Sequence, residues 1–189
     1  MGDVHDFRER LEWSASLSDE PSWEAFYRSI WPDINRIVQV EGRCWDQKHG
    51  IDREVVLNNG RRFTIDEKKR AKDYGDVLLE VWSVCDSDGT AITGNPETRK
   101  IGWALDDEKR CDFIVYAIPS ADKAYLLPFE ILRLALKSNM REWASLRGCR
   151  WPVLAKNRGY YTASIAVPWP ILKDAMAAEM VRAWGEVTA

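Results

Sequence analysis

The sequence predicts a mixed α/β (α+β) protein with a central mixed β-sheet flanked by helices. Three observations predict this class. A strand–turn–strand pattern surrounds Asn59-Gly60, further strand-like apolar runs occupy residues 76–83 and 112–118, and helical periodicity precedes and follows these runs. Strands interleaved with amphipathic helices are typical of a sheet covered by helices.

The chain's length and composition fit a soluble globular protein. Its 189 residues suit one domain, 1–189, with a core at about 22–139 and a C-terminal extension at 140–189. It contains no apolar run long enough to span a membrane, and its first residues are charged rather than leader-like. Four scattered cysteines without a C-x-x-C motif argue against zinc and suit reduced thiols. We therefore expect a cytoplasmic protein with no membrane partner.

The first predicted element is an amphipathic helix that starts near Pro21, a residue suited to a first helical turn. We expect Pro32 to kink or split this helix, because proline removes a backbone donor. Its apolar stripe follows helical spacing and comprises Trp23, Phe26, Tyr27, Ile30, Trp31, Ile34, Ile37 and Val38.

A β-hairpin follows, because Asn-Gly is the strongest short turn signal and strand-forming residues flank it. Its register decides which acid faces Asp52. A two-residue loop places Asp52 opposite Glu67, whereas a three-residue loop places it opposite Asp66. We favour the second register, because it separates an apolar face from a face that carries Asp52, Asp66 and Lys68. The Glu67/Lys69 pair remains the alternative.

The remaining elements follow from apolar runs and turn residues. Residues 76–83 predict a strand buried on both faces, and 84–100 predict a long loop. Only 103–109 has any helical character before the next strand. The later predicted elements are strands at 112–118 and 124–127, a helix opened by Pro128, a helical continuation at 141–150, a strand at 160–167 and a helix at 171–184.

The two acids and the lysine suggest phosphodiester chemistry. Two close carboxylates repel each other unless a cation lies between them. Mg²⁺ favours such oxygen ligands and completes its shell with water and phosphate. A lysine on the same face could orient or deprotonate the attacking water. The net charge of −3 argues against a protein that coats nucleic acid without sequence preference. It is compatible with a local contact to nucleic acid that a metal ion assists.

Gly50-Ile51-Asp52 and the strand ending Asp66-Glu67-Lys68 resemble the motifs of the PD-(D/E)XK nuclease superfamily. The resemblance implies a restriction-endonuclease-like core of order α-β-β-β-α-β. It also implies that Asp52 and Asp66 bind Mg²⁺ (or Mn²⁺) and that Lys68 is catalytic, with Glu67 and Lys69 in reserve. The chain departs from the motifs at Ile51, where proline is usual, and at Glu67, where an apolar residue is usual. Its later segments resemble nuclease-like proteins common in phage and prophage genomes.

Three hypotheses follow. The first is a metal-dependent endonuclease that hydrolyses DNA, with RNA an open alternative substrate. The second is a catalytically inactive nuclease fold that serves as a DNA-binding or assembly module. The third is a different α/β fold with an incidental charged hairpin. The oligomeric state, a homodimer included, stays open. The chain has no phosphate-binding glycine loop and no G-x-S-x-G motif, which argues against nucleotide-cofactor enzymes and serine hydrolases.

Overall fold

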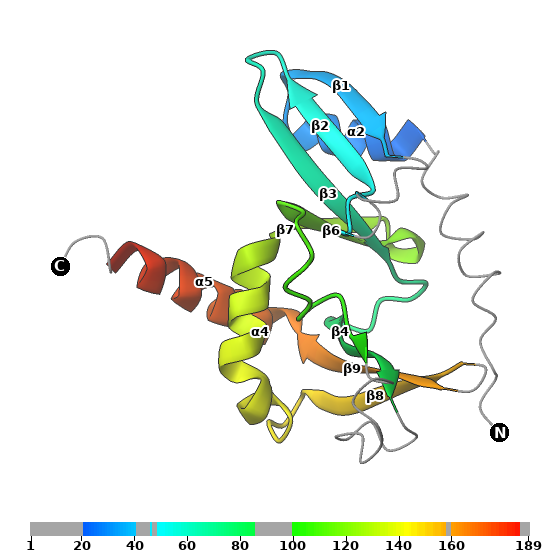
Figure 1. Ribbon diagram of the computed structural model, residues 1–189, viewed down its shortest axis with the longest axis vertical. Helices are drawn as coiled ribbons and strands as arrows, with labels where there is room; N and C mark the ends of the chain where they lie inside the picture. Colours follow the sequence, from blue (N-terminus) through cyan, green and yellow to red (C-terminus); the bar gives the residue numbers. More distant parts are fainter. Residues whose placement is uncertain (1–20, 41–45, 47–48, 86–99, 158–159, 186–189) are drawn as a thin grey trace. The chain divides into compact units, whose positions relative to one another are not determined.

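The chain forms two β-sheets in a computed structural model that describes residues 21–40, 46, 49–85, 100–157 and 160–185 (Figure 1). It divides into two compact units. One unit, which we call the site unit, comprises Phe7–Asp73 and Asp107–Phe129. The second unit comprises Met1–Asp6, Tyr74–Asp106 and Glu130–Ala189. The mixed α and β character is confirmed, whereas one domain with a core at 22–139 stays a prediction.

The site unit contains a five-stranded sheet of order β1-β2-β3-β6-β7. Neighbouring strands pair antiparallel except β3 and β6, which pair parallel, so the sheet is mixed as predicted. The parallel pair requires a long connection between β3 and β6. The strands are β1 Ile34–Gln39, β2 Arg53–Leu57, β3 Arg62–Lys69, β6 Phe113–Ile118 and β7 Lys123–Pro128.

The β2–β3 hairpin adopts the predicted three-residue register. Val55 faces Phe63, and the Leu57 amide donates a 2.9 Å hydrogen bond to the Arg61 carbonyl. Gly60 has φ +83°, the left-handed conformation that the last residue of a three-residue hairpin loop adopts. The preference for Asp66 over Glu67 as the residue facing Asp52 is therefore supported by the observed pairing.

Helix α2 (Pro21–Ile30) begins at the predicted proline but ends before Pro32. The expectation that helical structure continues through Ile34, Ile37 and Val38 is wrong, because these residues form β1. Proline disfavours helical conformation in the residue that precedes it, so Pro32 ends the helix instead of kinking it. The apolar spacing after Pro32 is also compatible with a strand.

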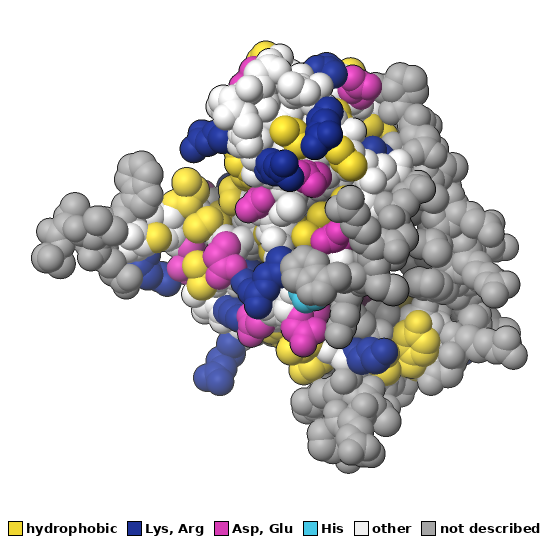
Figure 2. Space-filling view, turned by 45° about the horizontal axis from the view of Figure 1, so that its top comes forward, with side chains coloured by type: hydrophobic (Ala, Val, Ile, Leu, Met, Phe, Trp, Pro, Cys, Tyr) yellow, Lys and Arg dark blue, Asp and Glu magenta, His cyan; other side chains and the backbone are white. Residues whose placement is uncertain are grey.

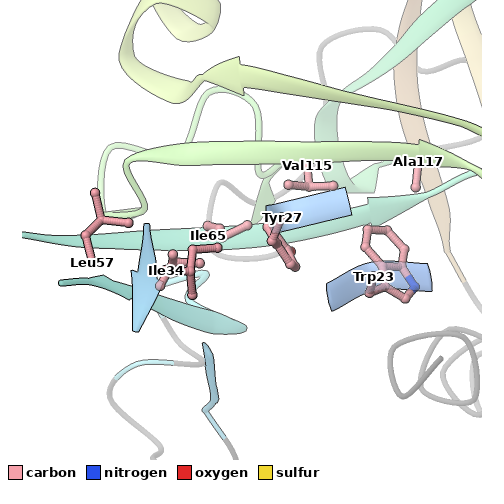
Figure 3. Close-up of a cluster of buried hydrophobic side chains, with 8 residues drawn as sticks. Trp23, Tyr27, Ile34, Leu57, Ile65, Val115 and Ala117 are labelled. Atoms are coloured by element: carbon pink, nitrogen blue, oxygen red, sulfur yellow. The ribbon is translucent and has the colours of Figure 1, made fainter. Parts of the chain in front are cut away.

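One core cluster joins α2 to the sheet of the site unit. Tyr27, Val55 and Ile65 are fully buried in it. Figure 3 shows side chains from α2, β3 and β6 converging in this cluster. Its buried members are Trp23, Tyr27, Ile34, Val55, Leu57, Ile65, Val115 and Ala117. Helix α2 therefore covers the face of β3 that carries Ile65, and Asp66 lies on the other face of that strand.

The second unit contains a four-stranded sheet of order β5-β4-β9-β8. The predicted strand at 76–83 is internal here, but it does not extend the hairpin sheet, which corrects the single central sheet we expected. The C-terminal segment supplies its partners β8 and β9. The elements are β4 Asp76–Cys85, β5 Lys100–Ile101, β8 Arg150–Lys156 and β9 Tyr161–Pro168, with helices α4 Phe129–Trp143 and α5 Trp169–Gly185.

Two further predicted elements differ from the structure, and one lies largely outside the described residues. Residues 103–109 form turns rather than a helix, and the helix expected through 141–150 ends at Trp143 and gives way to β8. Most of the predicted 84–100 loop lies outside the described residues. Among the helices that the structure describes, none is both long enough and apolar enough to cross a bilayer.

Candidate active site

Strand β3 separates its charged residues between its two faces. Side chains alternate along a strand, so Asp66 and Lys68 lie on one face while Glu67 and Lys69 lie on the other. The second face also carries Ile65, which is buried in the α2 core. The structure thus brings Asp66 and Lys68 together and separates them from the reserve pair Glu67 and Lys69.

Asp52 lies directly before β2 and beside Asp66. The Asp52 amide donates to the Ile65 carbonyl at 2.8 Å, and the Asp52 carboxylate accepts from the Glu67 amide, also at 2.8 Å. The Lys68 ammonium donates to the Asp66 carboxylate. Asp66 is only 2% exposed, whereas the Lys68 side chain is 29% exposed. The three predicted residues therefore form one cluster with a buried acid at its base.

Burial raises the pKa of Asp66 to about 7, against an ordinary value of 3.8. Lys68 opposes this shift, and the neighbouring Asp52 carboxylate adds to it. The lysine does not restore the ordinary pKa of this buried carboxylate, so the negative charge of the ionised form is incompletely compensated. A further positive charge next to Asp66 would therefore be stabilised by the cluster.

The opposite face of β3 holds a second charged cluster, which we call the Glu67 network. The Glu67 carboxylate accepts from the Tyr27 hydroxyl at 2.8 Å and from Arg53 Nε at 2.5 Å, and it lies 3.4 Å from Lys69 Nζ. Lys69 also lies over the Trp23 ring, at 5.3 Å from its centroid. Burial raises the pKa of Tyr27 and lowers the pKa of Lys69. Because two cations and a hydroxyl surround Glu67, its geometry suits a structural role.

Sequence inspection missed two residues that lie near Asp66, Lys109 and Cys111. A Cβ atom on Gly50 would lie 2.8 Å from Lys109 Cδ and 3.2 Å from Asp66 Oδ2. Cys111 is buried nearby, and its pKa is raised to about 12 by burial and by the Asp66 charge. Such a thiol stays protonated and unreactive at neutral pH. The sequence signal for this contact was limited to a glycine two residues before Asp52.

The loop that carries Lys109 is tied to the rest of the site unit directly after that lysine. The Arg110 amide donates to the His49 carbonyl and the Asp112 amide donates to the Thr64 carbonyl, each at 2.9 Å. The Asp112 carboxylate accepts from the Thr64 amide at 2.7 Å and from its hydroxyl at 2.9 Å. These links fix Lys109 relative to the acids.

The donor set fits a hard divalent cation. Among the described residues, no group of three or more His, Cys, Asp or Glu side chains is arranged to hold a metal ion. The protein would contribute the two carboxylates of Asp52 and Asp66. Mg²⁺ commonly binds through one or two carboxylates, with waters and a substrate phosphate completing its shell. Glu67, the third predicted ligand, points to the opposite face and interacts with Arg53 and Lys69.

Acidic and basic side chains are interspersed on the face of the molecule drawn in Figure 2. That face shows no broad basic field among the described residues, in keeping with the net charge of −3. A nucleic-acid partner would therefore need local contacts to its phosphates.

Comparisons with family models, with curated proteins and with solved structures found no match to this chain. The residues of the site therefore carry the functional inference.

Proposed function

We propose that the protein is a metal-dependent nuclease that hydrolyses phosphodiester bonds in DNA. The single observation that carries this proposal is the cluster of Asp52, Asp66 and Lys68 on one face of the hairpin. Asp66 is buried there with a pKa near 7 although Lys68 contacts it. A site that buries an incompletely compensated acid beside a second acid is suited to binding a cation.

Each residue has a role in this proposal. Asp52 and Asp66 would hold Mg²⁺ or Mn²⁺, which supplies Lewis-acid activation of water and stabilises charge on the phosphate. The Asp52 carboxylate is oriented by the Glu67 amide. Lys68 is partly exposed and can exchange its contact with Asp66 for one with an attacking water or a phosphate oxygen.

The order of elements in the site unit supports a restriction-endonuclease-like core. Helix α2 precedes β1, β2 and β3, and β6 then pairs parallel to β3. The two motif segments lie directly before β2 and at the end of β3. The core departs from the expected order between β3 and β6. The described residues there contain β4, β5 and turns, and they contain no helix. We include a cytoplasmic location in the proposal, since Cys111 and Cys149 form no disulfide.

Cleavage of plasmid and single-stranded DNA tests the proposal, with Mg²⁺ or Mn²⁺ present. Asp66→Asn and Lys68→Met remove one proposed role each with little change of shape, and we expect each to lower the rate at least about 100-fold. Glu24→Gln and Lys72→Met are matched controls, because both residues are exposed and Glu24 pairs only locally with Arg28 among its described contacts. The controls should cleave like the wild type.

The alternative of an inactive DNA-binding or assembly module predicts a different pattern. It predicts DNA binding without cleavage under any metal condition. Absence of cleavage of DNA and RNA by the wild type, together with no change of melting temperature on adding Mg²⁺ or Mn²⁺, would rule out the enzyme. A ligand that binds the native state must raise its apparent stability, so the melting measurement detects metal binding without turnover.

A further inference from the structure

We propose that Lys109 binds a backbone phosphate of the nucleic acid next to the one that is cut. This inference rests on the proposed function and extends it to a residue that neither motif contains. Lys109 lies 57 residues after Asp52 in the chain, so only the fold brings it to the acids.

The position of Lys109 follows from the space beside Gly50. The Cδ and Cε atoms of Lys109 lie 2.8 Å and 3.5 Å from the point where a Gly50 Cβ would be, and Asp66 Oδ2 lies 3.2 Å from the same point. The lysine stem and the acid therefore flank one glycine. Gly50 also has φ +72°, which disfavours any other residue at this place. The backbone thus leaves the space that the Lys109 stem occupies.

The loop is held before any ligand binds. Directly after Lys109, the chain is joined to His49 through Arg110 and to Thr64 of β3 through Asp112. A lysine on a fixed loop loses less conformational freedom on binding than one on a free surface chain. Lys109 is half-buried, so its stem is packed while its ammonium lies one bond beyond Cε. This arrangement presents one positive charge at the edge of the cluster.

The charges of the cluster favour phosphate as the ligand. Asp52, Asp66 and Lys68 act on one another directly, and the Lys109 stem packs beside Asp66 at Gly50. When a divalent cation engages the carboxylates, Lys68 can leave Asp66 and bind an anion, whereas Lys109 can bind an anion with or without the metal. Lys68 follows Asp66 on the same strand and is suited to the reacting phosphate. Lys109 approaches from the Gly50 side and is suited to the neighbouring phosphate on the same strand of nucleic acid.

The test is the salt dependence of DNA binding. The dissociation constant of a fluorescent duplex is measured in EDTA between about 50 and 300 mM salt for the wild type, Lys109→Met and Lys109→Arg. Losing one phosphate contact should lower the slope of log K against log salt by about 0.9 and weaken binding about five- to tenfold at 0.1 M salt. The loss should be equal for duplexes of unrelated sequence, and Lys109→Arg should retain the slope. Lys173→Met, which alters an exposed lysine of α5, should match the wild type.

Kinetics in Mg²⁺ separate this inference from the proposed function. For Lys109→Met we expect KM to rise about five- to tenfold and kcat to change less than about threefold. A phosphate contact stabilises the bound substrate and the transition state equally, so its loss raises KM alone. If the wild type cleaves DNA but Lys109→Met keeps its KM and salt slope, the inference is wrong and the nuclease stands. If the wild type binds DNA with a Lys109-dependent slope but never cleaves, the inference stands and the nuclease fails. Absence of both binding and cleavage overturns both.

Discussion

Asp66→Asn should make the metal-free protein more stable at neutral and alkaline pH, although it removes a charged residue from an ion pair. The pKa of Asp66 is about 7 in the folded protein and 3.8 as its ordinary value. The folded state therefore binds more protons than the unfolded state between these two pH values. Stability falls as pH rises through that window, because burying the ionised carboxylate costs free energy.

The size of the effect follows from the shift. About three pKa units correspond to about 4 kcal/mol at pH 8, which is an upper bound. Asparagine keeps a polar group of similar shape but loses the contact with Lys68, whose exposed part keeps its solvation. We therefore expect Asp66→Asn to gain about 1–3 kcal/mol at pH 8 in EDTA, or a rise in melting temperature of about 3–10 °C. At pH 4 the difference should vanish, since the carboxyl is then largely protonated in the folded state.

The assay is thermal and urea unfolding in EDTA at pH values from 4 to 8.5. Glu24→Gln serves as the control, because this exposed acid pairs with Arg28 on one helix and should change stability by less than about 0.5 kcal/mol. Adding Mg²⁺ at pH 8 should stabilise the wild type and leave Asp66→Asn unchanged. If Asp66→Asn is less stable than the wild type at pH 8 without metal, Lys68 compensates the acid fully, and the electrostatic reasoning for a cation site is refuted.

Two further predictions concern the same strand. Because protons and Mg²⁺ compete for the Asp66 carboxylate, apparent Mg²⁺ affinity should rise up to about tenfold per pH unit below pH 7 and level off above it. Thermal-shift titrations at pH 6, 7 and 8 measure this, and an affinity independent of pH would contradict it. Glu67→Gln should lower the free energy of unfolding by about 3–5 kcal/mol, because it leaves Arg53 and Lys69 buried without their acid. Urea unfolding at pH 8 measures the loss, and a change below about 1 kcal/mol would show that the Glu67 network is not needed for stability.

The hairpin and its register were predictable because the signals were local. Asn59-Gly60 determines where the chain turns, and the period of two along the strands assigns each residue to a face. Residues 113–118, 123–128 and 169–185 were also close to prediction, since their apolar runs are long and bounded by proline or polar turns. These features depend on neighbours in sequence.

The missed strands depend on the fold. β1 followed apolar spacing that fits a helix as well as a strand, and only its pairing with β2 decides between them. β8 contains Pro152 and lies at the edge of its sheet, where a residue without an amide donor is tolerated. The apolar run of β4 correctly indicated an internal strand, but no local signal says which sheet a strand joins. Lys109 was missed for the same reason, because a contact between a loop residue and residues distant in sequence produces no periodic pattern.

The four charged residues Asp66 to Lys69 show how one strand can make two opposite electrostatic environments. On one face, Glu67 is surrounded by Tyr27, Arg53 and Lys69, so its charge is balanced within the protein. On the other face, Asp66 is equally buried, yet Lys68 and its neighbours leave its pKa near 7. A balanced buried charge contributes to one rigid arrangement, whereas an unbalanced one lowers stability until a cation binds. If both faces were structural, selection for stability would favour balance on each. The uncompensated charge of Asp66 is therefore a stronger indication of a binding function than the acid–acid–lysine–lysine sequence itself.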